Sequence, residues 1–180
     1  MIVVVAATER ELDGVRGAET LVCGIGPVEA ALATAHRIVA RRPEAILHVG
    51  IAGARTLEPP ALVLGSDSVY CDIVDERSVI PRVERISPDA QLLARVHAVL
   101  PGAHVLPIAT SASVGGGTHC DVEAMEGFGV LRAAALAGVP AVELRAVSNT
   151  VGEPDRARWR FEDALAALRE AVPRALDALA

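Results

Sequence analysis

The stretch from Val122 to Asn149, VEAMEGFGVLRAAALAGVPAVELRAVSN, decides the fold. An acidic segment leads into a helix-like run that ends at Gly138, and a buried strand follows it. This order places the carboxylate of Glu126 at the start of a helix and the amide of Asn149 just past the carboxyl end of a strand. Ligands in open α/β sheets bind outside the carboxyl ends of strands. We therefore expect Glu126 and Asn149 to meet over one small molecule.

The rest of the chain continues this alternation of strands and helices. Apolar runs rich in β-branched residues predict strands at residues 2–6, 19–23, 45–49, 61–71, 78–80, 104–109 and 141–147. Apolar residues at helical spacing predict helices at residues 28–41, 89–100, 126–137 and 161–179, with Pro173 marking a kink or a break in the last. The pattern predicts a three-layer αβα fold with a mostly parallel central sheet. A length of 180 residues favours a single domain, 1–180.

Composition narrows the class of function. The net charge is −6, which argues against a nucleic-acid surface, and all 17 cationic residues are Arg, which excludes a Schiff-base lysine. Three scattered cysteines without a C-x-x-C pair suit a reducing cytosol and do not form a metal site. No metal or other cofactor is expected. The N-terminal residues lack a basic, signal-like start, so the default expectation is a cytoplasmic protein without a membrane anchor.

Two segments near the N-terminus allow more than one interpretation. Gly24-Ile-Gly26 lies between a predicted strand and a predicted helix, as in half of a dinucleotide fingerprint, but Glu29 occupies the place of the third glycine. It predicts either a tight turn, which can present backbone near a ligand, or an NAD site. Glu9 and Glu11 follow the first strand. They are either helix N-terminal charges or, in one case, a general base that holds a water.

The polar residues of the deciding stretch also have structural interpretations. Glu126 could simply cap its helix. Arg145 lies inside an apolar strand, where an unpaired charge is costly, so it is expected to pair with a carboxylate. It then serves either the structure or the organisation of a site. Asn149, after Ser148, could be merely a turn former.

Taken together, five segments resemble the purine nucleoside phosphorylase and nucleosidase superfamily. They span most of the chain in the family's order, at residues 7–11, 23–27, 49–53, 122–127 and 142–149. Within the superfamily, Met125-Glu126-Gly127, Ser148-Asn149 and the region of Trp159 resemble futalosine hydrolases more than methylthioadenosine/S-adenosylhomocysteine nucleosidases.

The resemblance implies a role for each matching residue. Glu11 falls where the family activates the attacking water, and Glu126 falls where it binds the ribose hydroxyls. Asn149 falls where adenine-cleaving members carry an aspartate near N7 of the base. The remaining expected substrate-binding residues are Gly53, Met125, Arg145, Ser148 and Phe161, the last of these near the 5′ substituent. Carboxylates such as Glu11 and Glu126 suit this reaction, because cleavage of an N-ribosidic bond passes through an oxocarbenium-like sugar that carboxylates stabilise.

Asn149 bears on the base. The edge of adenine offers an acceptor, N7, beside a donor, the 6-amino group, which a protonated Asp complements. The edge of hypoxanthine offers two acceptors, N7 and O6, and the NH₂ of a carboxamide carries two donors. Asn149 therefore favours a 6-oxopurine, whose departure it would stabilise by hydrogen bonding.

The attacking group is expected to be water. Phosphorylases of this superfamily frame the glycine turn after the central strand with Arg and Ser, where this chain has His48 and Ile51. Ile51 has no hydroxyl, and His48 is a poor substitute for a bidentate Arg.

The expected activity is hydrolysis of futalosine to hypoxanthine and dehypoxanthinylfutalosine, a step of menaquinone biosynthesis. The alternatives are a methylthioadenosine/S-adenosylhomocysteine nucleosidase, a purine nucleoside phosphorylase, an NAD-binding protein or a catalytically silent nucleoside-binding module. The chain is short for the family, and its glycine-rich segment at residues 110–119 has no aromatic residue where relatives stack the base. Stacking must then come from elsewhere, be weak, or come from a partner subunit of a homo-oligomer.

Overall fold

The computed structural model describes residues 1–73, 81–115 and 117–180. Its centre is an eight-stranded sheet in the order β2-β1-β3-β7-β6-β4-β5, with β8 pairing to both β3 and β4. The strands are β1 Ile2–Ala6, β2 Glu19–Val22, β3 Ala45–Ala54, β4 Leu62–Tyr70, β5 Arg85–Ile86, β6 His104–Thr110, β7 Val122–Ala124 and β8 Ala141–Thr150. Five of the strand pairs are parallel, and β3/β7, β4/β5 and β4/β8 are antiparallel. The prediction of a mostly parallel sheet is confirmed.

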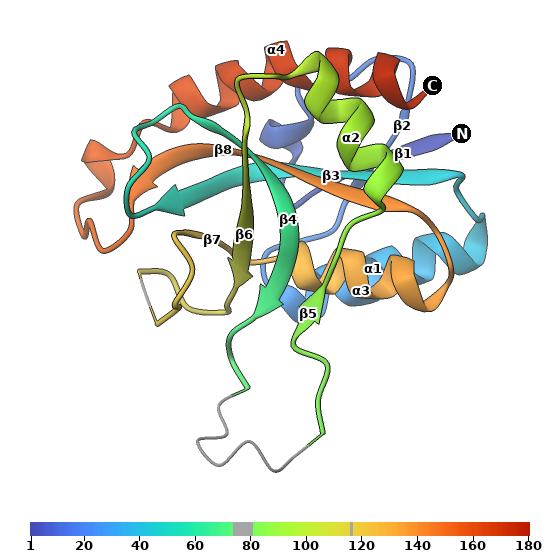
Figure 1. Cartoon of the computed structure of the whole chain (residues 1–180), viewed down its shortest axis with the longest axis horizontal. Coiled ribbons are helices and arrows are strands. Elements are labelled where there is room, and N and C mark those ends of the chain that lie inside the picture. The colour runs from blue at the N-terminus through green and yellow to red at the C-terminus, as the bar shows by residue number, and fades with distance from the viewer. Residues whose placement is uncertain (74–80, 116) are drawn as a thin grey trace.

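Helices cover both faces of this sheet (Figure 1). The helices are α1 Pro27–Ala40, α2 Ala90–Val99, α3 Gly127–Leu136 and α4 Phe161–Leu179. The first and third pack together, as do the second and fourth. A buried aliphatic cluster fills each space, with Leu47 and Leu144 facing α4 and with Val5 and Ile46 facing α3. The three-layer prediction is confirmed.

Two expectations about single elements need correction. Of the kink or break expected at Pro173, the break is wrong, because this residue lies inside a continuous α4. The buried apolar face of α4 holds the helix on the sheet across this residue. Asn149 does not follow a strand but lies within β8, which continues to Thr150 because it pairs with β3 through Gly53↔Asn149. A register shift at Ala52/Gly53 accompanies that pairing.

The sequence also missed β5 and β7. Both are very short, two and three residues, and they carry little periodicity of their own. The strand expected at residues 78–80 lies outside the described residues. In the described part of the chain, no helix is long and apolar enough to cross a membrane.

Candidate active site

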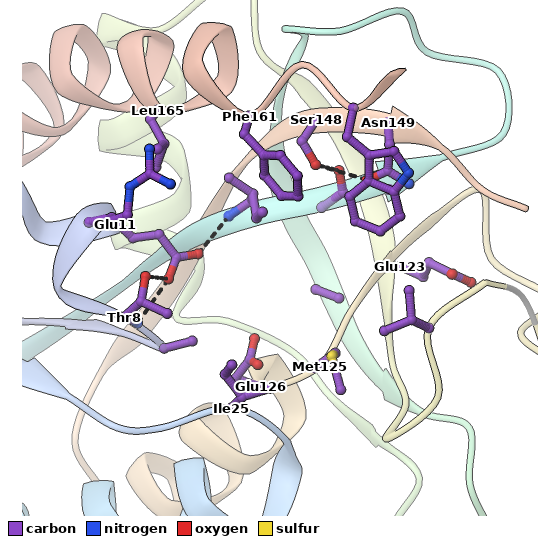
Figure 2. Close-up of a pocket in the computed structure, with 18 of the residues that line it drawn as sticks. Thr8, Glu11, Ile25, Glu123, Met125, Glu126, Ser148, Asn149, Phe161 and Leu165 are labelled. Atoms are coloured by element: carbon purple, nitrogen blue, oxygen red, sulfur yellow. Dashed lines mark hydrogen bonds between the residues drawn. The ribbon is translucent and has the colours of Figure 1, made fainter. Parts of the chain in front are cut away.

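A pocket of about 320 Å³ lies where the carboxyl ends of β1, β3, β7 and β8 meet (Figure 2). The residues that line it are Ala7, Thr8, Arg10, Glu11, Ile25, Ile51, Ala52, Gly53, Ser113, Val114, Glu123, Ala124, Met125, Glu126, Ser148, Asn149, Trp159, Phe161 and Leu165. Every site residue predicted from the sequence is among them except Arg145. Glu126 and Asn149 therefore do share one pocket.

Glu11 lies on a 3-10 helix, Glu9–Leu12, directly after β1. Its Oε2 accepts hydrogen bonds from the backbone N of Thr8 at 2.9 Å and from the Thr8 hydroxyl at 2.8 Å, and its Oε1 accepts one from the backbone N of Ile51 at 3.0 Å. A carboxylate has about four lone-pair sites, so one on Oε1 is left over. Glu9 is exposed and outside the pocket. Of the two candidates, Glu11 alone is placed to hold a water.

Glu126 is the N-cap residue of α3, but its side chain caps nothing, so the capping interpretation is wrong. Its Oε1 accepts from the backbone N of Gly26 at 3.1 Å, and its Oε2 lies 3.4 Å from both terminal nitrogens of Arg145. Burial raises the pKa of Glu126, and the charge of Arg145 opposes that rise. The Gly24-Ile-Gly26 turn thus presents backbone to a carboxylate of the pocket.

Arg145 pairs with carboxylates, as predicted, but it lies behind the pocket and does not line it. Its Nε donates to Glu143 at 2.9 Å, and Glu143 also accepts from the hydroxyl of Ser68. Only 1% of Arg145 is exposed. The expectation that Arg145 lines the substrate site is therefore corrected: it contacts the pocket residues Glu126 and Ile51 from behind.

Ser148 and Asn149 sit side by side on the pocket wall. The Ser148 hydroxyl lies 2.8 Å from Oδ1 of Asn149, and Nδ2 of Asn149 donates to the carbonyl of Thr150 at 3.1 Å. These bonds orient the carboxamide, and they leave one of its two N–H groups for a ligand. A Cβ at Gly53 would lie 3.1 Å from Nδ2. Glycine at this position gives Asn149 the room that its orientation requires.

Comparison with known proteins identifies the family of this chain. The family model of the phosphorylase superfamily matches residues 19–180. This chain belongs to the phosphorylase superfamily. A futalosine hydrolase of Streptomyces coelicolor is 36% identical over an alignment that covers 87% of this chain and 77% of that relative.

Solved structures share the fold of this chain. A futalosine hydrolase mutant of Helicobacter pylori superposes with a TM-score of 0.87 at 19% identity, covering 98% of each chain. A 5′-methylthioadenosine/S-adenosylhomocysteine nucleosidase of Colwellia psychrerythraea, in complex with adenine, superposes with a TM-score of 0.85 at 20% identity. That superposition covers 99% of this chain and 95% of the other.

Within this phosphorylase superfamily member, His48 does not face the pocket. It is fully buried, with Nδ1 3.0 Å from the carbonyl of Val5 and Nε2 2.5 Å from Nη2 of Arg145. Because an arginine only donates, Nε2 accepts and Nδ1 carries the proton. Burial and the charge of Arg145 hold the pKa of His48 well below its usual value. His48 is therefore a neutral acceptor that fixes Arg145.

Sequence reasoning missed several residues of the pocket. Leu165 gave no motif, Arg10 lay in the matching segment at residues 7–11 but received no role, and Trp159 was noted only as part of a resemblance. The rings of Trp159 and Phe161 lie 5.3 Å apart, and the backbone N of Arg160 between them donates to the carbonyl of Ser148 at 2.7 Å. That bond ties the aromatic pair to the strand that carries Asn149. Among the described residues, no group of three His, Cys, Asp or Glu side chains could hold a metal ion.

Proposed function

We propose that this protein hydrolyses the N-ribosidic bond of a 6-oxopurine nucleoside, with futalosine as its substrate. The products would be hypoxanthine and dehypoxanthinylfutalosine, and the reaction would serve menaquinone biosynthesis. One observation carries the proposal: two buried carboxylates, Glu11 and Glu126, and the amide of Asn149 line a single pocket (Figure 2). The similarity to the futalosine hydrolase of Streptomyces coelicolor supports the choice of substrate.

The two carboxylates have separate tasks. As the bond to the base stretches, positive charge develops on the sugar, and hydrogen bonds from its hydroxyls to a carboxylate strengthen. Glu126 accepts those bonds, since Arg145 and the backbone N of Gly26 hold it in the wall of the pocket. Glu11 holds a water on its remaining lone pair and takes the proton as that water attacks the sugar.

Asn149 meets the leaving base. Its free N–H donates to one acceptor on the hypoxanthine edge, N7 or O6. The second N–H reaches the other acceptor by exchanging its bond to the Thr150 carbonyl for one to the ligand. Ser148 keeps donating to Oδ1, so the NH₂ group stays on the side of the ligand.

The surroundings of residues 48 and 51 favour hydrolysis over phosphorolysis. Ile51 brings an apolar side chain into the pocket, and its backbone N–H is already used by Glu11. His48 is buried, neutral and outside the pocket, so it offers no charge to a phosphate. Among the described residues that line the pocket, Arg10 is the one cation, and it lies on the 3-10 helix after β1, not at position 48 or 51.

We also propose that the protein works as a homo-oligomer in the cytoplasm. Val28 and Leu32 lie four positions apart on α1 and expose 65% and 63% of their surface. Ile25, just before that helix, exposes 62% and lines the pocket. Such an apolar stripe supports coverage by a second copy. The three cysteines are free, as suits a reducing compartment. Sedimentation of the protein as a monomer at assay concentrations would contradict the oligomer.

The experiment that tests the activity compares futalosine, inosine and methylthioadenosine, each with and without phosphate. The proposal predicts free hypoxanthine and a free sugar from futalosine at a rate that phosphate does not change. A sugar 1-phosphate product would indicate a phosphorylase. Preferred release of adenine would indicate a methylthioadenosine nucleosidase. No base release from any of the three would indicate a silent binding module.

A further inference from the structure

The pocket has few groups on which a flat base could stack. A purine is a planar π system, and stacking on an aromatic ring holds a base whatever the pattern of its edge. Among the described residues that line the pocket, only Trp159 and Phe161 are aromatic. The glycine-rich segment at residues 110–119 contributes Ser113 and Val114, which carry no ring. The candidates for the stacking partner are therefore the two rings beside β8.

Trp159 is tied to β8 at two points. On its backbone side, the N–H of Arg160 donates to the carbonyl of Ser148 at 2.7 Å. On its side-chain side, the indole Nε1 donates to the carbonyl of Glu153 at 3.1 Å. The backbone N of Glu153 in turn donates to the carbonyl of Thr150 at 3.1 Å. Both the backbone and the ring of Trp159 are thus held against the end of this strand.

Asn149 lies between these two points of attachment in β8. The indole of Trp159 is therefore held beside the carboxamide that we assign to the edge of the base. Phe161 begins α4, and in the view of Figure 2 its ring stands between Leu165 and Asn149. Of the two rings, Trp159 is the one that the hydrogen bonds fasten on both sides of Asn149.

One face of the indole is left for a ligand. The guanidinium of Arg156 lies over the Trp159 ring, 5.5 Å from its centroid. Arg156 is exposed and does not line the pocket, so it covers the ring from the solvent side. Trp159 is half-buried and does line the pocket, so its other face borders the cavity. A cation at this distance attracts the ring and helps to hold it in place.

We propose that Trp159 stacks on the purine base of the substrate while Asn149 binds the edge of that base. This inference rests on the proposed function for the place of the base. It divides base recognition between two residues. Asn149 selects among purines through its hydrogen-bond donors, and Trp159 adds affinity that is similar for every purine, because each base has a π face.

The test removes the ring in two steps. Trp159→Phe loses the indole N–H and its bond to Glu153 but keeps an aromatic face, whereas Trp159→Leu loses that face as well. Calorimetry measures the affinity of each protein for hypoxanthine and for adenine, without any turnover. Trp159→Leu should weaken the binding of both bases roughly 5- to 150-fold, the effect of losing one base–aromatic stack. Trp159→Phe should stay within about threefold of wild type, and neither variant should change the ratio of the two affinities more than about threefold.

Two results of this comparison would overturn the inference. Equal losses in Trp159→Phe and Trp159→Leu would trace the effect to the bond with Glu153 and not to the ring. A loss confined to one of the two bases would mean that Trp159 reads the edge of the base.

A second measurement needs wild type alone. Trp159 is the one tryptophan of the chain, so tryptophan emission reports the surroundings of this ring. Hypoxanthine should quench that emission. A base-free sugar with an aromatic 5 group, 5-deoxy-5-(phenylthio)ribose, should leave it unchanged. The reverse pattern would place Trp159 at the 5′ substituent and overturn the inference, as would hypoxanthine binding without quenching.

The inference and the proposed function fail in different ways. Quenching by hypoxanthine and the expected loss of affinity in Trp159→Leu, without hydrolysis of any nucleoside, would retain the stacking and refute the nucleosidase. Hydrolysis of a nucleoside together with an unchanged hypoxanthine affinity in Trp159→Leu would retain the nucleosidase and refute the stacking.

Discussion

Replacement of Glu11 by Gln removes the charge and keeps the shape of the side chain, which makes it a direct probe of the proposed general base. Three donors converge on this carboxylate: the backbone N and hydroxyl of Thr8 and the backbone N of Ile51. A carboxamide has a single oxygen, and it cannot serve both backbone donors. Whichever way it is oriented, its NH₂ group faces one buried N–H.

Glu11→Gln should lower both the turnover rate and the stability of the fold. Loss of general-base assistance should lower kcat by about 10²- to 10⁴-fold. One unsatisfied buried donor should cost about 1–3 kcal/mol of folding free energy. In a chain of this length each kcal/mol shifts Tm by about 2–4 °C, so Tm should fall by roughly 2–12 °C.

The assay combines hypoxanthine release at a temperature well below both melting points with a calorimetric Tm. Glu9→Gln serves as the control, because Glu9 is exposed and lies outside the pocket. Its rate should equal that of wild type. Near-normal turnover of Glu11→Gln, even with a lowered Tm, would refute the general base and leave Glu11 as a structural cap of its 3-10 helix.

Four further outcomes are expected around Glu126. Glu126→Gln should lower turnover of ribonucleosides more than that of 2′-deoxy substrates, and equal losses on both would argue against contact with the diol. Burial raises the pKa of Glu126, and the ionised form is the active one, so kcat/KM should decline as the pH falls through a value above the usual 4.5. That raised pKa also means that Glu126 favours folding at low pH and costs stability once the pH rises through its folded pKa. A pH profile with the same acid limb in Glu126→Gln would contradict this assignment. Arg145→Gln strands the buried carboxylates of Glu126 and Glu143 and should cost about 3–5 kcal/mol in chemical denaturation.

The strands and helices with strong periodicity were predictable from the sequence. β1 is a continuous β-branched or aliphatic run, the core of β3 is aliphatic except for His48, and α1 and α4 repeat apolar residues at helical spacing. These patterns report burial, which local sequence encodes directly. The two-residue β5 and three-residue β7 depend instead on strands that arrive from elsewhere in the chain.

The site was predictable only where a motif marked it. Glu11 and Asn149 stood out because each follows a predicted strand, and Glu126 stood out because it starts a predicted helix. The structure brings all three into one pocket. The place of Asn149 inside β8 depends on a register shift against β3, which neither strand shows alone. The sequence assigned Arg10 no role, and its partner, Glu162, lies 152 positions away.

The buried network behind the pocket could not be derived from spacing. Arg145 was expected to find a carboxylate, but the sequence did not show which one. Glu143 lies two positions away on the same strand, and Glu126 is the N-cap residue of α3, the helix before that strand. His48 is neutral because Arg145, on the neighbouring strand β8, donates a hydrogen bond to its Nε2. Such assignments need three-dimensional neighbours, since the charge state of a buried group depends on what faces it.

Discrimination between two bases at Asn149 tests the central claim most directly. The measurement is kcat/KM for hypoxanthine and adenine nucleosides with the same 5′ group, in wild type and Asn149→Asp. A site that leaves buried polar groups unpaired rejects the wrong substrate strongly, so wild type should prefer the 6-oxopurine. Asp at this position faces the Thr150 carbonyl, which favours its protonated form, and a protonated Asp complements adenine. The substitution should therefore shrink or reverse the preference. A wild-type preference for adenine, or a ratio that the substitution leaves unchanged, would contradict the account.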